Sequence, residues 1–197
     1  MLLEHIALLN SRRILLASQS PRRKAILNQL GLQNFEQIPS GYAEDLDSKK
    51  FTPKNFAMET ARHKAVDVWN LFCARSHADE NTTPDLVLAA DTVVVLGDEI
   101  LGKPATTEDA CVTLRKLSGT SHQVVTGCAL CYKEKSSASA SASSSLESGS
   151  GGEDATSFLT HTFAVAATVH FAVLSESEIQ AYVATGEPMD KAGKLFF

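Results

Sequence analysis

A short apolar run that leads through a polar loop into a helix constrains the fold of this sequence most. Residues 14–17 are uniformly apolar (ILLA), and residues 18–20 (SQS) are all polar. Ser20 is a favourable N-cap and Pro follows it, so we expect a helix over residues 21–30, which Gly31 can terminate. A strand, a tight loop and a helix in this order are typical of the start of an α/β fold.

The rest of the sequence continues to alternate between helix and strand patterns. We expect further helices over residues 53–72, 107–117 and 175–186, and strands near residues 122–133 and 160–174. Between these, "DLVLAADTVVVLGDEILGKP" predicts a strand, an acidic residue and another strand. Gly97 and Asp98 mark a hairpin turn within this series. Because some strands are joined by hairpins and others by helices, we predict an α/β fold with a mixed central β-sheet flanked by helices.

Composition and charge narrow the class of protein. With 197 residues, 44% of them apolar, the chain can build a single globular domain over residues 1–197. Ser, Ala and Gly dominate residues 134–157, which we interpret as a flexible low-complexity insertion at a hairpin tip. No apolar run approaches the roughly 20 residues that a membrane span requires. The four cysteines do not have the spacing of a metal site, and we interpret them as thiols of a protein in a reducing compartment. We therefore expect a cytoplasmic protein, and the net charge of −5 argues against nucleic acid as a partner.

Two arginines stand where a helix ordinarily avoids cations. Arg22 and Arg23 fall in the first turn of the first predicted helix, whereas the helices after Thr106 and Ser175 begin with acidic residues. A cation there opposes the helix dipole by about 0.3–1 kcal/mol. An anionic ligand such as a phosphate would resolve the conflict, because free N–H groups and guanidinium groups would converge on it. Alternatively, the arginines extend into water or pair with acidic side chains.

Three further charged residues are candidates for the same chemistry. Asp91 interrupts the apolar strand pattern between "LVLAA" and "TVVVL", so it requires a metal, a polarised water or a lysine; the alternative is a structural salt bridge. Lys64 falls on the apolar stripe of its helix, where its ammonium group reaches either a pocket or solvent. Lys103 precedes a proline, which favours an extended backbone and a fixed direction for its side chain. Glu44, by contrast, is one of several acids in a loop.

Together these stretches resemble the Maf family of nucleoside triphosphate pyrophosphatases. The matching segments follow the family's order and span residues 14–193: "LLASQSPRRKAIL", "ETARHKA", "AADTVVVLGDEILGKP", "LRKLSGTSHQVVTG" and "EPMDKAG". Both arginines of "SPRR", the threonine after Asp91 and "DKAG" are similar to the branch that acts on dTTP and UTP. The resemblance implies a Maf/ITPase-like architecture with a cleft. The resemblance leaves the oligomeric state open, with a homodimer as one alternative.

The resemblance also implies an activity and the residues that carry it. A nucleoside triphosphate, including modified pyrimidine nucleotides, would be hydrolysed to the monophosphate and pyrophosphate, with Mg²⁺ or Mn²⁺ as cofactor. By this resemblance, phosphates would be bound by Ser18, Arg22 and Arg23, and charge would be neutralised by Lys64 and Lys103. Asp91 would activate water or bind the metal, and Glu44 would bind the metal. Thr92 would contact the base, and Lys191 would close the site. Such chemistry depends on positioning and fixed positive charge.

The sequence departs from the family in two places. Family members continue after "DKAG" with a "YGIQG"-like stretch, whereas this sequence reads "DKAGKLFF", so the glutamine that would contact the nucleotide is absent from it. The second departure is the Ser/Ala/Gly insertion. An alternative function also stays open: a nucleotide-binding regulator of cell division without turnover. Because a sensor needs only the cations, the presence of both Asp91 and Glu44 favours the enzyme.

Overall fold

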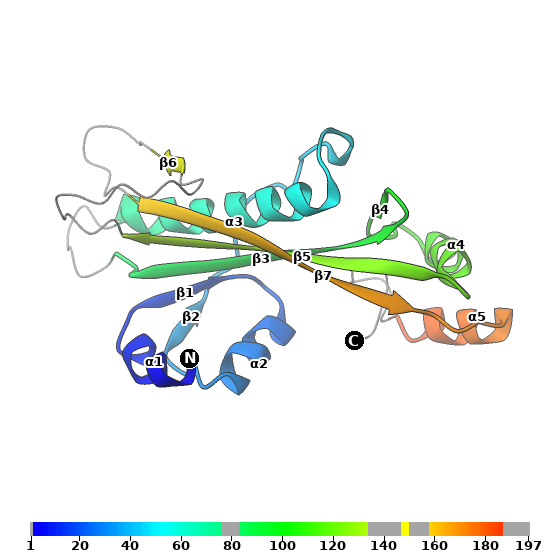
Figure 1. The fold of residues 1–197 in the computed structure, drawn as a ribbon, viewed down its shortest axis with the longest axis horizontal. Helices are drawn as coiled ribbons and strands as arrows, with labels where there is room; N and C mark the ends of the chain where they lie inside the picture. Colours follow the sequence, from blue (N-terminus) through cyan, green and yellow to red (C-terminus); the bar gives the residue numbers. More distant parts are fainter. Residues whose placement is uncertain (1, 76–82, 134–146, 150–157, 187–197) are drawn as a thin grey trace. The chain divides into compact units, whose positions relative to one another are not determined.

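The computed structural model describes residues 2–75, 83–133, 147–149 and 158–186, and it is an α/β structure built on one mixed sheet (Figure 1). Its helices are α1 (Leu2–Asn10), α2 (Pro21–Gln29), α3 (Pro53–Arg75), α4 (Thr107–Leu117) and α5 (Glu176–Ala184), with a short 3-10 helix η1 (Ser48–Lys50). The predicted fold class, a mixed sheet flanked by helices, is confirmed.

The strands pair in an order that combines parallel and antiparallel neighbours. They are β1 (Ile14–Ala17), β2 (Phe35–Gln37), β3 (Leu86–Leu96), β4 (Glu99–Leu101), β5 (Ser121–Lys133), β6 (Glu147–Gly149) and β7 (Phe158–His170). The sheet order is β2-β1-β3-β5-β7-β6, and β4 pairs with β3. β1 is parallel to both β2 and β3, whereas β3–β4 and β6–β7 are antiparallel.

The chain forms two compact units, each made of three segments. The first unit comprises residues 1–45, 58–90 and 128–163, and the second comprises residues 46–57, 91–127 and 164–197. The single domain over residues 1–197 stays a prediction. Of the predicted insertion at residues 134–157, the structure describes only β6, which pairs with β7, and the flexibility of the remainder stays a prediction.

The first unit has helices on both faces of its part of the sheet. Because side chains alternate along a strand, Ile14 and Leu16 of β1 face one side, where they pack with residues of α1 and α2. Leu15 and Ala17 face the other side and pack against α3. Figure 1 shows α1 and α2 beside β1 and β2. All four residues of β1 are buried, so this strand lies in the core of the first unit.

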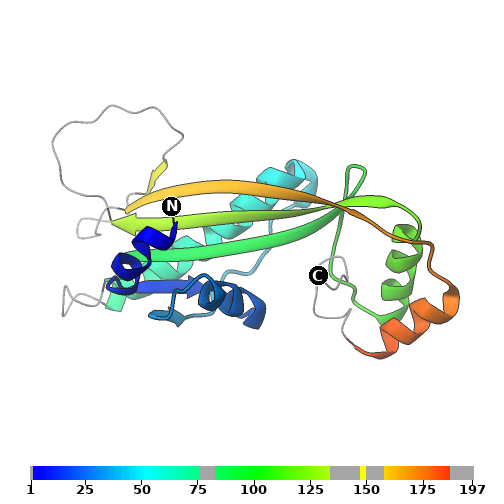
Figure 2. The ribbon, with the colours of Figure 1, turned by 60° about the horizontal axis from the view of Figure 1, so that its bottom comes forward.

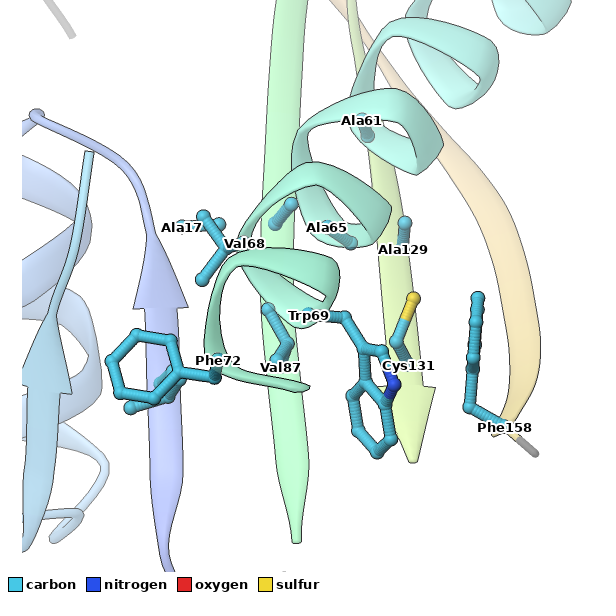
Figure 3. Close-up of a cluster of buried hydrophobic side chains, with 12 residues drawn as sticks. Ala17, Ala61, Ala65, Val68, Trp69, Phe72, Val87, Ala129, Cys131 and Phe158 are labelled. Atoms are coloured by element: carbon cyan, nitrogen blue, oxygen red, sulfur yellow. The ribbon is translucent and has the colours of Figure 1, made fainter. Parts of the chain in front are cut away.

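A stripe of small residues lets α3 lie close to the sheet. Ala61 and Ala65 are fully buried, and Trp69 follows them one turn later at 1% exposure. Figure 3 shows the Trp69 indole beside Cys131 and Phe158, and its ring centroid lies 5.2 Å from that of Phe158. Burial of an aromatic side chain of this size is a large part of a small core's stabilisation. α3 is therefore a rigid platform for the side chains on its other faces.

The second unit packs α4 and α5 together and places apolar strand residues against them. Ala110 and Leu114 of α4 form a core with Ile179 and Val183 of α5, and Figure 2 shows the two helices side by side. Both helices begin with a capping box, at Thr106 and at Ser175. Within the described residues, no helix is both long and apolar enough to cross a membrane.

Candidate functional site

Ser18 lies at the centre of a hydrogen-bond network between the end of β1 and the start of α2. Its side chain is buried, with 6% of the residue exposed. Its Oγ accepts hydrogen bonds from the backbone N–H of Ser20 at 3.1 Å and from Nη1 of Arg23 at 3.2 Å. The Arg23 guanidinium therefore folds back toward the strand end instead of extending away from the helix, and the structure brings these two predicted phosphate ligands together.

The start of α2 has the predicted geometry. Ser20 is the N-cap, its side chain accepts a hydrogen bond from the backbone N–H of Arg23, and Pro21 is the first helical residue. The first turn of α2 holds no acidic residue, whereas those of α4 and α5 each hold two. Arg22 is exposed and Arg23 is half-buried. This helix end thus combines positive side chains with the positive end of the helix dipole, which favours an anion.

Gln37 is a member of this network that sequence reasoning missed. Its Nε2 donates to the carbonyl oxygen of Ser18 at 2.8 Å and to that of Ser20 at 3.4 Å. Gln37 ends β2, which pairs in parallel with β1, so the sheet positions the side chain against the loop. Only the tertiary pairing of the two strands reveals this role, because a glutamine in a three-residue strand has no distinctive sequence pattern.

Lys64 and Glu44 form the second pair of predicted site residues that the structure brings together. The Lys64 side chain is only 12% exposed, and its Nζ lies 2.9 Å from Oε1 of Glu44, whose side chain is 44% exposed. The Lys64 side chain is thus largely buried, and its ammonium group meets a carboxylate instead of solvent. The Glu44 loop and α3 therefore place a carboxylate and a positive charge next to each other.

The other described candidates belong to the second unit. Asp91 and Thr92 follow Ala90 in the middle of β3, and both are half-buried. Oγ1 of Thr92 lies 3.1 Å from Oγ1 of Thr126 on β5, a contact that sequence reasoning did not predict. β3 is one continuous strand through Asp91, so the carboxylate does not break the strand. Lys103 is exposed and comes directly before Pro104.

The predicted residues thus form two groups. Ser18, Arg22, Arg23, Glu44 and Lys64 belong to the first unit, and Asp91, Thr92 and Lys103 belong to the second. Lys191 lies outside the described residues. In the parallel pairing of β1 and β3, Ala17 is level with Ala89, which precedes Asp91 by two positions. A single site that contains both groups stays a prediction.

A hollow in the second unit has a volume of about 600 Å³ and is lined by residues from the start of α3, β3 and β5, among them Lys54, Asp98 and Gln123. None of the predicted site residues that the structure describes is among its lining residues. Phosphate recognition depends on charge and hydrogen-bond donors more than on cavity size, and the charged groups around Ser18 and Glu44 supply both.

The fit of a divalent cation depends on the donor chemistry. Within the described ranges, no group of three or more His, Cys, Asp or Glu side chains has the arrangement of a metal centre. Mg²⁺ commonly uses only one or two protein carboxylates and completes its shell with water and substrate phosphates. The partly exposed carboxylate of Glu44 is a hard oxygen donor of this kind, so the residues present suit Mg²⁺ or Mn²⁺ bound together with a polyphosphate.

None of the four cysteines forms a disulfide. Cys131 is fully buried in the core of the first unit. Burial raises the pKa of Cys131 to about 11, so at neutral pH its thiol is protonated. Burial also raises the pKa of Cys128, against a smaller opposite influence of Arg23. Cys131 behaves as a small core residue, whereas Cys128 is half-buried, and the two face opposite sides of β5 as the alternation along a strand predicts.

Comparison with known proteins identifies a family. The family model described as "Maf-like protein" matches residues 13–195, which is nearly the whole chain. The match includes every residue that the sequence analysis placed in the site.

The individual relatives are named as dTTP/UTP pyrophosphatases. The chain is 40% identical over 183 residues to a human protein named "Probable bifunctional dTTP/UTP pyrophosphatase/methyltransferase protein", covering 92% of this chain and 26% of that protein. It is also 40% identical to proteins named "dTTP/UTP pyrophosphatase" from Anaeromyxobacter dehalogenans, over 184 residues, and from Aquifex aeolicus, over 181 residues. These alignments cover 92% of this chain and 75% and 76% of the respective relatives. The chain thus spans about a quarter of the human relative and three quarters of the bacterial ones.

Proposed function

The chain belongs to the Maf-like protein family, and on that premise we propose that it is a nucleoside triphosphate pyrophosphatase that acts on dTTP and UTP. The observation that carries this proposal is the 40% identity over 92% of the chain to relatives named dTTP/UTP pyrophosphatase. The contact between Arg23 and Ser18 at a helix start and the contact between Lys64 and Glu44 support it, because both place positive charge beside groups suited to phosphate or metal.

The products, a nucleoside monophosphate and pyrophosphate, define which bond of the triphosphate is broken. Water adds to the triphosphate, the anhydride bond between the α and β phosphates breaks, and the nucleoside monophosphate and pyrophosphate leave. The bridging oxygen takes the electron pair of the broken bond, so negative charge grows on the pyrophosphate. Fixed cations lower the barrier by stabilising this charge, and they need no rearrangement during the reaction.

We assign the phosphate-binding role to the start of α2. The N–H groups of its first turn and the guanidinium groups of Arg22 and Arg23 would hold phosphate oxygens, and Ser18 keeps Arg23 in position through its 3.2 Å hydrogen bond. Lys64 and Lys103 would neutralise the charge that develops on the departing pyrophosphate. Lys191 would close the site, and Thr92 would contact the base.

The carboxylates supply the remaining chemistry. Glu44 and Asp91 would hold Mg²⁺ or Mn²⁺, which when bound neutralises and orients phosphate oxygens. Asp91 would also accept a proton from the attacking water. Substrate binding would separate Lys64 from Glu44, because the ammonium group and the metal compete for the same carboxylate oxygen.

A substrate panel tests the proposal. Purified protein is incubated with dTTP, UTP, CTP and 7-methyl-GTP in the presence of Mg²⁺, and pyrophosphate and monophosphate are both quantified. We expect release of pyrophosphate from dTTP and UTP in equal amount to the monophosphate, and slower release from the other two. Tight binding of dTTP without any product would contradict the enzyme and favour a nucleotide-binding regulator of cell division.

A further inference from the structure

The loop that carries Glu44 is fastened to α3 by hydrogen bonds to a single side chain. Oδ2 of Asp67 accepts a hydrogen bond from Oγ of Ser40 at 2.9 Å and another from the backbone N–H of Gly41 at 2.7 Å. Oγ of Ser40 in turn accepts a hydrogen bond from the backbone N–H of Tyr42 at 3.0 Å. One carboxylate oxygen thus fixes the first part of the loop over residues 40–44.

Two further contacts continue along the same side of α3. The Tyr42 ring stacks on the His63 ring, with a centroid separation of 4.7 Å and an interplanar angle of 10°. Two residues later, Glu44 meets Lys64 at 2.9 Å. Residues 63, 64 and 67 are neighbours on a helix surface, because positions three and four apart lie one above another. The loop therefore lies along α3 over about one helical turn.

The backbone of Glu44 has a conformation that the residue does not adopt by itself. Its φ is +52°, and among the described residues it is the one non-glycine residue with a positive φ. A left-handed conformation is unfavourable for a residue with a Cβ unless surrounding contacts impose it. The contacts of the preceding residues to α3 are such a constraint on the backbone at Glu44, and the ion pair with Lys64 holds its carboxylate.

From these contacts we infer that Asp67 is a positioning residue for Glu44. Asp67 holds Ser40 and Gly41 on α3, and this sets the Glu44 carboxylate in the orientation in which Glu44 binds the divalent cation. This inference rests on the proposed function in so far as Glu44 is a metal ligand. Asp67 itself touches neither metal nor substrate. Its role is to hold the loop in one conformation before the cation arrives, so that binding does not have to order the loop.

Two measurements on the same variants test the inference. Hydrogen exchange of the backbone amides of Gly41 and Tyr42 is followed in metal-free protein, and the affinity for Mn²⁺ alone is measured from the electron paramagnetic resonance signal of the free ion. For Asp67→Ala we expect faster exchange at both amides and about tenfold weaker Mn²⁺ binding, since loss of a supporting residue commonly weakens a metal site by that factor or more. Ser40→Ala should shift both readouts in the same direction.

Two comparison variants separate positioning from general loss of stability. Asp67→Asn keeps an oxygen acceptor at the same place, so it should retain most of the amide protection and of the Mn²⁺ affinity. Asp85→Ala removes a similar bond, because Oδ2 of Asp85 accepts the backbone N–H of Arg13 at 2.8 Å at the amino-terminal end of β1 and β3. It should leave both readouts at the wild-type value.

Specific outcomes would overturn the inference. Unchanged exchange at Gly41 and Tyr42 in Asp67→Ala would show that the loop is held by other contacts. Mn²⁺ affinity within twofold of the wild-type value would show that loop position does not matter for the metal, and absence of Mn²⁺ binding to the wild-type protein would remove the metal role itself. The pyrophosphate assay decides separately whether the enzyme assignment holds, so the two failures can be told apart.

Discussion

Arg22 and Arg23 stand at the end of a helix where positive charge lowers stability, and we propose that an anionic ligand accounts for them. Ser20 and Pro21 already specify the helix start, so α2 does not need the arginines in order to form. Arg23 is anchored to Ser18, whereas Arg22 is exposed. We therefore expect the arginines to strengthen ligand binding and to lower the stability of the empty protein, so the two effects should be measured separately.

Replacing Arg22 by Ala should weaken substrate binding without destabilising the empty protein. We expect the binding free energy of dTTP to weaken by about 1.5–3 kcal/mol, as for a lost charged hydrogen bond, and KM to rise accordingly. The metal-free, nucleotide-free protein should unfold at the same or a slightly higher temperature, because a cation is removed from the positive end of the helix dipole. Steady-state kinetics and thermal unfolding on the same preparation measure both effects.

Lys24→Ala is the matched control, because Lys24 is an exposed cation in the same region of α2 that we do not place in the site. It should leave KM unchanged. A fall in unfolding temperature for Arg22→Ala, with KM unaffected, would mean that this arginine supports the fold and not the ligand.

Asp91→Asn should reduce turnover while the fold is retained, because the amide has nearly the size of the carboxylate but is a poor proton acceptor and metal ligand. We expect kcat to fall by about 10²–10⁴-fold, the range that general base catalysis contributes. Asp98→Asn, in the exposed hairpin turn between β3 and β4, is the control with the same chemical change. If Asp91→Asn turned over dTTP at the wild-type rate, the proposed role of Asp91 would be wrong.

Among the elements, α3 packs against the sheet with one face and contacts the loop that carries Glu44 with another. Its small residues pack against the sheet, while Lys64, Asp67 and His63 face the loop over residues 40–44. A third set of contacts lies within the helix: Glu59 accepts hydrogen bonds from Arg62 and lies 3.3 Å from Nε2 of His63. The hydrogen bond from Arg62 lowers the pKa of Glu59, more than burial raises it, and the charges of Arg62 and His63 act in the same direction.

The lowered pKa of Glu59 predicts a pH-dependent contribution to stability. Because the folded pKa lies below the unfolded value of 4.5, the stabilisation is complete above that pH and is lost as the pH falls through the folded pKa. Glu59→Gln should therefore lower the free energy of unfolding by about 0.5–1 kcal/mol at neutral pH and by less at about pH 3.5.

Urea unfolding at both pH values measures the Glu59 effect. Glu99→Gln, which removes an exposed pair with Lys116, is the control and should change stability less at neutral pH. An effect of Glu59→Gln that stays the same at both pH values would show that shape, and not charge, is responsible.

The elements with strong local signals were the ones that the sequence predicted well. The helix over residues 107–117 has exactly the predicted bounds, because the Thr106 capping box and Gly119 mark its ends. The hairpin at Gly97 and Asp98 is also confirmed. By contrast, α1 and β2 were not predicted: α1 packs through Ile6 and Leu9 only once β1 is in place, and β2 is too short to show alternation.

The site was predicted as a set of residues but not as a set of contacts. The arginines, Asp91 and Lys64 are visible in the sequence because each breaks a local pattern. Glu44 became a candidate only through the family resemblance, and Gln37, Asp67 and Thr126 were missed altogether. Those three act through neighbours that are distant in sequence, at 19, 26 and 34 positions, so no local pattern reveals them.

For the whole molecule, five sequence motifs point to one reaction. The motifs run from residue 14 to residue 193, and the matching family model covers residues 13–195. The phosphate-binding candidates and Glu44 belong to one compact unit, and Asp91 to the other. The central claim is that these groups together break the bond between the α and β phosphates of a pyrimidine nucleoside triphosphate.

The products of dTTP turnover test this claim most directly. Phosphorus NMR of a reaction that contains the protein, dTTP and Mg²⁺ distinguishes every way in which the triphosphate can be cut. We predict that the dTTP signals are replaced by those of dTMP and pyrophosphate in equal amounts, and that Asp91→Asn suppresses both. Formation of dTDP and inorganic phosphate, or unchanged dTTP in the presence of protein that binds it, would contradict the account.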